Sequence, residues 1–403
     1  MSLKNLLEEA RALEAGCIED RRQLHGRAET GFDLNQTREY VRKRLTEMGY
    51  APEDCGRCGL VCTVGKPGKT FLLRADMDAL PIREESGLPF ACENGNMHAC
   101  GHDMHAAMLL TAAQLLKKHE AELNGTVKLM FQPAEEPLMG AKDMIAAGVL
   151  ENPHVDAAMM VHVLSGQSIP AGTAIVSAPG VSAPAAGNFS IHIQGKGAHG
   201  AMPNTGVDPI NIAAHIIIAL QEINARELAL SQSAALTIGM VQAGATANVI
   251  PDTALVRGNY RSYDDETSEL IQRRIVEISA GIAATFRGEA HVQFDSDCPT
   301  LINNADLCAL AEKALAQALG ENRVFNAARL AGSGASRSSG SEDFASVSQR
   351  VPSFMLALAA GEPEKGYTHP LHHPKAAFDE SALVSGSVAY AAVAMGWLEA
   401  QKQ

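Results

Sequence analysis

A dense cluster of metal-binding side chains is the most informative feature of the chain. The run from His98 to His105, HACGHDMH, supplies three imidazoles, one thiol and one carboxylate. Thiolate and imidazole together suit borderline-soft divalent metals. Cys100 and His102 would point about 200° apart on a helix, so they can converge on an ion only from a loop. The run predicts a metal site where a loop enters a helix capped by Asp103; histidines that bind nothing are the alternative.

The chain holds enough donors for two metal ions at one site, namely Cys100, His102, Glu136, His162 and His372. Two ions about 3.5 to 4 Å apart can hold a bridging water, lower its pKa toward about 7 and polarise a carbonyl. The pair Glu135-Glu136 fits this chemistry, because hydrolysis needs one carboxylate on the metal and another free to take a proton. A solvated acidic turn is the alternative. Together these residues predict a hydrolase.

Apolar segments that read as buried strands must position these groups. They are Thr70–Asp78, ending in carboxylates, Thr126–Gln132, running into Glu135-Glu136, and Val155–Val161, running into His162. Helical patterns between them favour a mostly parallel α/β sheet. Ligands of such sheets gather beyond the carboxyl ends of the strands, so we expect the groups to meet there.

A second domain is predicted inside the first. Residues 177–187 are rich in Ala, Pro, Gly and Ser, as in a linker. The order strand, helix, strand, strand, helix, strand then follows, which is that of a ferredoxin-like α+β domain. We assign these elements to 188–194, 208–230, 235–242, 248–260, 266–284 and 291–296. We therefore expect a discontinuous catalytic domain over 1–183 and 297–403, with a lid or dimerisation domain inserted at 184–296.

Motifs along nearly the whole chain resemble the M20 metallopeptidases, in particular the branch of aminoacylases, hippurate hydrolases and auxin-conjugate hydrolases. The motifs are Arg22–His25, Leu73–Ile82, Met97–His105, Gln132–Glu136, Gly195–Gly200, Ala247–Asp252, Gly340–Phe344 and Leu371–Pro374. The resemblance implies hydrolysis of the amide bond in N-acyl amino acids or similar small conjugates. Metal-bridged hydroxide would attack the acyl carbon.

The resemblance also implies roles for residues of the catalytic domain. Two divalent metal ions per subunit would be bound by Cys100, His102, Glu136, His162 and His372, with the thiolate where other branches bridge with aspartate. Glu135 would be the general base. Asp78 would orient a ligand, and Asp103 would support the ligands without binding metal. His98 and His105 are expected to pack beside the site.

In the inserted domain the resemblance implies three further roles. His199 would reach across a dimer interface and stabilise the oxyanion. Asn248 and Arg261 would hold the carbonyl and the carboxylate of the substrate, and the fork of an arginine suits a carboxylate. A homodimer, or a tetramer built from it, is therefore expected.

Composition limits the class of protein. The 403 residues are 46% hydrophobic and 20% charged, as in ordinary globular proteins, and the net charge of -13 argues against nucleic-acid or anionic-membrane partners. The N-terminal segment has no apolar signal region, and no run of about 18 apolar residues suggests a membrane span. The eight scattered cysteines are expected as reduced thiols, and Cys55, Cys58 and Cys62 more as such than as a zinc site. We expect a cytoplasmic enzyme with a small-molecule substrate.

Other functions remain open from the residues. An aminopeptidase or dipeptidase could use the same two metals. Cys100 could instead be a covalent nucleophile with a neighbouring histidine as base. A non-catalytic metal-binding protein is a third possibility. The metals themselves are expected to be Mn²⁺ or Zn²⁺, with Co²⁺ or Ni²⁺ as alternatives.

Overall fold

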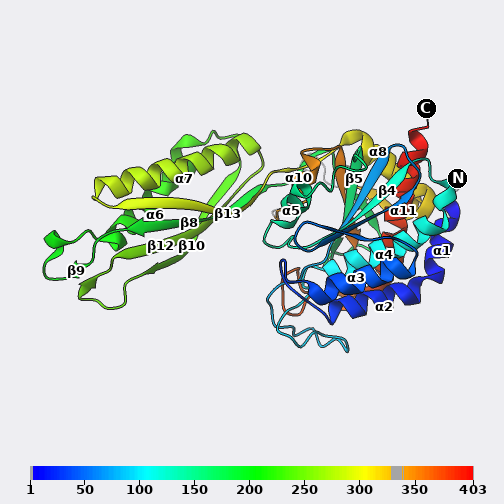
Figure 1. The fold of residues 1–403 in the computed structure, drawn as a ribbon, viewed down its shortest axis with the longest axis horizontal. Coiled ribbons are helices and arrows are strands. Elements are labelled where there is room, and N and C mark those ends of the chain that lie inside the picture. The colour runs from blue at the N-terminus through cyan, green and yellow to red at the C-terminus, as the bar shows by residue number, and fades with distance from the viewer. Residues whose placement is uncertain (1–2, 328–337, 339, 403) are drawn as a thin grey trace. The chain divides into compact units, whose positions relative to one another are not determined.

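The computed structural model describes residues 3–327, 338 and 340–402 and divides into two compact units (Figure 1). The larger unit, called the catalytic unit after the predicted catalytic domain, contains the residues up to Ser182 and those from Ile302 onward, except a short segment ending at Glu342. The inserted unit contains Ala183–Leu301 and that short segment. The connecting strands β7 (Gly180–Ala183) and β14 (Leu301–Asn303) pair with each other.

An eight-stranded sheet forms the centre of the catalytic unit, in the order β1-β2-β4-β3-β5-β16-β6-β15. Its strands are β1 (Glu53–Cys55), β2 (Gly59–Gly65), β3 (Thr70–Asp76), β4 (Thr126–Gln132), β5 (Ala157–Leu164), β6 (Ala174–Val176), β15 (Val324–Asn326) and β16 (Ser353–Ala359). The central strands β4, β3, β5 and β16 run parallel. Every residue of β3 and β4 is buried, as in a sheet covered on both faces. The predicted mostly parallel α/β sheet is confirmed.

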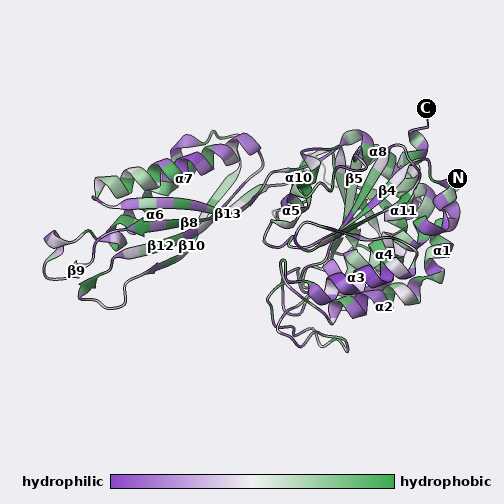
Figure 2. Ribbon diagram, viewed as in Figure 1, coloured by the Kyte–Doolittle hydropathy of each residue, from purple (hydrophilic) through white to green (hydrophobic). Residues whose placement is uncertain are grey.

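Helices cover this sheet. Among the described residues of the catalytic unit, the helices are α1 (Leu6–Ala12), α2 (Glu14–His25), α3 (Asn35–Glu47), α4 (His102–Lys118), α5 (Gly140–Ala146), α8 (Ala305–Leu319), α10 (Ala345–Ser348) and α11 (Leu383–Ala400). Figure 2 shows α2 and α3 as largely hydrophilic, whereas the sheet is hydrophobic. Helix α11 is long and apolar enough to cross a membrane by composition, but 89% of its apolar window is buried in the unit, as in a core helix.

The inserted unit is a four-stranded antiparallel sheet with two helices on one face. Its elements are β8 (Ala185–Gln194), α6 (Pro209–Glu222), β10 (Ala234–Ala243), β12 (Thr253–Ser262), α7 (Asp265–Thr285) and β13 (Glu289–Cys298). The sheet order β10-β12-β8-β13 is that of a ferredoxin-like domain, which confirms the prediction. Asp208 and Asp264 cap α6 and α7 by accepting backbone N–H bonds. The predicted helix 208–230 ends earlier, because a π-helical turn, Ile223–Glu227, follows α6.

A short ribbon extends from the inserted unit. It consists of β9 (Ala198–His199) and β11 (Val249–Ile250), in which His199 pairs with Val249. In Figure 1 the ribbon lies at the end of the unit remote from its connecting segments.

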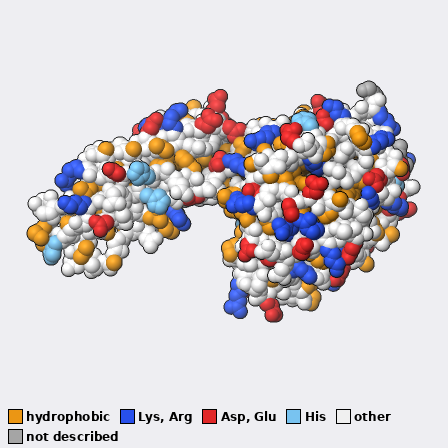
Figure 3. Space-filling view, viewed as in Figure 1, with side chains coloured by type: hydrophobic (Ala, Val, Ile, Leu, Met, Phe, Trp, Pro, Cys, Tyr) orange, Lys and Arg blue, Asp and Glu red, His pale blue; other side chains and the backbone are white. Residues whose placement is uncertain are grey.

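The face of the molecule in Figure 3 carries acidic and basic side chains intermixed over the catalytic unit.

Candidate metal centre

The loop before α4 positions Cys100 and His102. Gly101 adopts a left-handed conformation with φ of 84°, and a Cβ there would collide with the Val163 side chain. Helix α4 then begins at His102. Asp103 therefore lies inside the first turn and makes no capping bond, so the predicted cap is wrong. Its carboxylate instead accepts hydrogen bonds from Arg21 Nε and His25 Nδ1, both 3.0 Å away.

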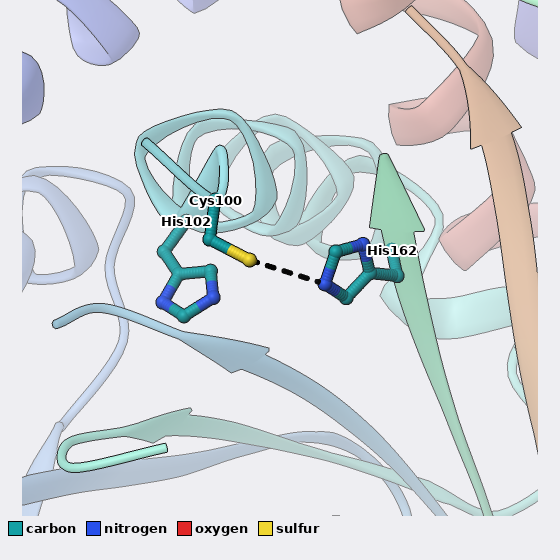
Figure 4. Close-up of side chains that lie close together, drawn as sticks. All are labelled: Cys100, His102 and His162. Carbon is teal, nitrogen blue, oxygen red and sulfur yellow. Dashed lines mark hydrogen bonds between the residues drawn. The ribbon is translucent and has the colours of Figure 1, made fainter. Parts of the chain in front are cut away.

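The structure brings together the five side chains predicted to bind metal. Cys100 Sγ lies 3.6 Å from His162 Nε2 and 3.3 Å from His372 Nε2. The thiol belongs to two groups of donors that each lie within 4.8 Å of one another: Cys100, His102 and His162, and Cys100, Glu136 and His372. Figure 4 shows the sulfur directed at His162 with the His102 ring beside it. This sharing of one thiol by two donor groups is the geometry that a pair of neighbouring ions requires.

Backbone carbonyls orient two of the imidazoles. His102 Nδ1 donates to the Asp78 carbonyl and His162 Nδ1 to the Val163 carbonyl, each at 2.8 Å. With Nδ1 donating in this way, the neutral form of each ring presents Nε2 as a lone pair, the usual state of a metal-binding histidine. His102 Nε2 is buried without a hydrogen-bond partner among the residues that the structure describes. That orphaned atom fits a metal ion.

The predicted end of the strand before His162 is wrong, since β5 continues its pairing with β16 to Leu164.

A strained loop between β4 and α5 presents the two glutamates. The Asp78 carboxylate accepts the backbone N–H of Glu135 at 3.0 Å and that of Glu136 at 3.1 Å. Ala134 and Leu138 both have left-handed φ angles, 52° and 60°, which cost energy for residues other than glycine. The carboxylates of Glu135 and Glu136 lie 4.0 and 3.9 Å from His102 Nε2. Asp78 thus orients His102 through its carbonyl and the glutamates through its carboxylate.

His372 comes from a segment distant in sequence. Its backbone N–H donates to the Ala99 carbonyl at 3.0 Å, which ties this segment to the loop of Cys100. Its φ of 65° is again left-handed. The ring is about half exposed, and Nε2 lies 3.5 Å from Glu136 Oε1. The most exposed of the five donors is therefore held by backbone geometry.

Burial sets the protonation of Cys100 and His162 in the absence of metal, whereas at His102 burial is outweighed by the charge of Asp76, which raises the pKa of the ring. It raises the pKa of the Cys100 thiol to about 12 and lowers the pKa of His162 to about 4. A buried, protonated thiol is a poor nucleophile, which disfavours covalent catalysis by Cys100. A metal ion would displace the proton and bind the thiolate.

Neighbouring candidates differ from these five. His105 donates from Nδ1 to Asp76 at 2.6 Å, and its Nε2 accepts the Val163 N–H at 2.9 Å. Both ring nitrogens are occupied, so His105 packs beside the site, as expected. The cysteines at 55, 58 and 62 are buried free thiols, and none joins a group of three metal donors in the described part of the chain.

The three residues predicted in the inserted unit do not all lie together. Asn248 and His199 share the β9–β11 ribbon, where the Asn248 carbonyl accepts the Gly200 N–H at 2.9 Å. Arg261 lies near the other end of β12, where Nη1 donates to Ser341 Oγ at 2.8 Å. Thr253 and Arg261 are eight positions apart on this strand, which corresponds to about 26 Å along it. In one inserted unit, Arg261 and the ribbon that carries His199 therefore lie toward opposite ends of β12.

A buried network beside the glutamate loop received no role from the sequence. Arg74 is fully buried on β3 and donates from Nη2 to Asp343 at 2.9 Å and from Nε to Gln132 at 2.9 Å. Two signals could have indicated it. One is an arginine inside an otherwise apolar strand, and the other is the motif Gly340–Phe344.

Known proteins resemble this chain over almost its full length. The N-acetyl-L-cysteine deacetylase of Bacillus subtilis is 36% identical over 93% of this chain and 86% of its own length. The hippurate hydrolase of Campylobacter jejuni is 34% identical over 98% and 100%. The crystal structure of the B. subtilis YXEP protein, described as a dinuclear metal binding peptidase from the M20 family, matches with a TM-score of 0.76 and 32% identity, covering 96% of this chain and 99% of that one.

The model of peptidase family M20/M25/M40 matches residues 72–396, most of the chain. The predicted family and the predicted class, a hydrolase acting on amide bonds, are confirmed by this match and these relatives. The chain belongs to peptidase family M20/M25/M40.

Proposed function

We propose that this enzyme hydrolyses the amide bond of N-acyl amino acids with two divalent metal ions and Glu135 as general base. The observation that carries the proposal is the sharing of Cys100 by two groups of donors, with Glu135 Oε2 4.0 Å from His102 Nε2. The ligands would be Cys100, His102, Glu136, His162 and His372. The names of the deacetylase and hippurate hydrolase relatives support an N-acyl amino acid as substrate.

Each side chain at the site has a separate role in the proposed reaction. Bound divalent ions lower the pKa of a water toward about 7 and polarise a carbonyl oxygen. Glu135 takes a proton from the attacking water and passes it to the leaving nitrogen. His199 Nδ1 accepts the Ala201 N–H at 3.0 Å, so its neutral ring carries the proton on Nε2 and can donate to the oxyanion. Arg261 binds the carboxylate of the substrate.

The separation of Arg261 and His199 supports a homodimer. We expect that one small substrate contacts only one of these two residues of a given inserted unit. We therefore assign Arg261 to the site of its own subunit, and His199 of the partner subunit to the oxyanion at that site. Asn248 lies on the ribbon with His199 and would hold the carbonyl from the same side. In a dimer with twofold symmetry, each subunit donates its His199 to the site of the other subunit.

The donor chemistry limits the choice of metals, and the free thiols support a compartment. Cysteine and histidine favour Zn²⁺, while the mixed nitrogen, oxygen and sulfur set also accepts Mn²⁺, Co²⁺ or Ni²⁺. All eight cysteines are buried free thiols, which supports a reducing compartment, the cytoplasm.

A substrate panel tests the proposal. The purified enzyme is expected to hydrolyse N-acetyl, N-benzoyl and indoleacetyl amino acids with a higher kcat/KM than free dipeptides, as the names of the deacetylase, hippurate hydrolase and IAA-amino acid hydrolase relatives suggest. Amidating the carboxylate of the best substrate should raise KM, since Arg261 then loses its charged partner. Higher kcat/KM for dipeptides would favour a dipeptidase and overturn the N-acyl assignment.

Metal removal separates the proposal from covalent catalysis. Exhaustive chelation is expected to abolish turnover, and adding Zn²⁺, Mn²⁺, Co²⁺ or Ni²⁺ separately to the apoprotein should restore it to different degrees. Elemental analysis of the active form should give two ions per chain. Turnover that survives chelation but is lost on thiol alkylation would instead support Cys100 as a nucleophile.

A further inference from the structure

The carboxylate of Asp343 joins the two ends of the loop that carries Glu135. The loop leaves β4 after Gln132 and enters α5 at Gly140. Asp343 accepts from Gln132 Nε2, at 2.7 Å to Oδ1 and 2.9 Å to Oδ2, and from the Ala141 N–H at 2.8 Å. One buried side chain therefore contacts the residue before the loop and the second residue of the helix after it.

The loop ends lie too close together for ordinary side chains. A Cβ on Gly140 would collide with the Pro133 carbonyl oxygen, so only glycine fits there. The left-handed residues Ala134 and Leu138 lie between these ends. Strained residues persist only where surrounding contacts over-determine them. Asp343, together with Asp78 on the loop backbone, supplies such contacts.

Asp343 also reaches the reacting group itself. Its backbone N–H donates to Glu135 Oε1 at 3.4 Å. The position of that N–H is fixed because the side chain of the same residue is anchored to Arg74 on β3, to Gln132 and to α5. Because Asp343 is anchored on β3, β4 and α5, its N–H can hold the Glu135 carboxylate in one orientation.

We propose that Asp343 is a positioning residue for Glu135: its carboxylate closes the glutamate loop, and its N–H orients the Glu135 carboxylate. The inference rests on the proposed role of Glu135 as general base. It requires that loss of the Asp343 carboxylate slows proton transfer while metal and substrate binding stay intact, because the Asp78 carboxylate still binds the Glu136 N–H and holds that ligand in place.

The test measures kcat, KM and metal content for Asp343→Ala, for the milder Asp343→Asn and for each in a Glu135→Gln background. Asp343→Ala is expected to lower kcat about tenfold to a hundredfold, with KM within about twofold and two metals retained. Asp343→Asn keeps one acceptor oxygen, so its kcat should lie between that of Asp343→Ala and that of the wild type. In the Glu135→Gln background either change should have almost no further effect, because the group being positioned is gone.

Asp20→Ala is the matched control. Asp20 is also buried, accepts from Arg44 Nε at 2.6 Å and Tyr40 OH at 2.7 Å, and lies on α2. Its loss should leave kcat unchanged. An equal fall in kcat in both backgrounds, or wild-type kcat in folded Asp343→Asn and Asp343→Ala, overturns the positioning role. A fully active Glu135→Gln enzyme overturns the proposed base, a result separate from any effect at Asp343. Should Asp343→Ala not fold, Asp343→Asn alone decides.

Discussion

Glu135→Gln is expected to lower kcat by about 10² to 10⁴-fold while two metals stay bound, because glutamine keeps the shape of the side chain but cannot accept the proton of the attacking water. The loop should keep its conformation, since the Asp78 carboxylate binds backbone N–H groups of Glu135 and Glu136 that the change does not touch. Steady-state kinetics with elemental analysis measures both quantities in the same preparation.

The adjacent residue provides the matched comparison. Glu136→Gln removes a predicted metal ligand, so it should lower the metal content as well as turnover, whereas Glu135→Gln should lower turnover alone. Two neighbours on one loop would thus give different phenotypes. A Glu135→Gln enzyme that holds two metals and turns over at the wild-type rate would contradict the assignment of the base, and identical metal loss in both variants would place Glu135 among the ligands.

Much of this site follows from the sequence because a parallel sheet imposes its own geometry. Apolar runs predict the strands β3, β4 and β5, which are parallel, so their carboxyl ends share one edge of the sheet. A group that follows such a strand closely, as Glu136 follows β4, therefore lies at the same edge of the sheet as His162. The ferredoxin-like unit can also be predicted from the sequence, because its strands and helices have clear periodicities and turn residues between them.

Other features depend on contacts that no local pattern encodes. The pairing of Asp103 with Arg21 and His25 joins residues about eighty positions apart, so a helix cap was the simpler interpretation of that carboxylate. The dual role of Asp78 depends on which of its oxygens faces which neighbour. The left-handed φ of His372 is a property of one backbone position, and its cost is offset by a hydrogen bond to a loop more than 270 residues away.

His199→Ala is expected to lower kcat by about 10² to 10³-fold, the usual loss when one oxyanion donor is removed. The Nε2–H of His199 would bind the oxygen more strongly once it carries negative charge, so KM should change much less than kcat. His192→Ala is the matched control in the same unit, because His192 lies exposed on β8 and has no proposed role. Equal losses from both variants would point to a disturbed fold and contradict the assignment.

A hybrid dimer decides which subunit uses the histidine. One subunit carries His199→Ala, the other Glu135→Gln, and the hybrid is isolated through two different affinity tags. If the histidine acts across the dimer, the site with an intact Glu135 receives His199 of the partner subunit, and the hybrid regains about half of the wild-type activity per dimer. If it acts within its own subunit, no site holds both groups and the hybrid stays as inactive as its parents. Because Arg261 and the ribbon that carries His199 lie toward opposite ends of β12 in one inserted unit, we expect the first result.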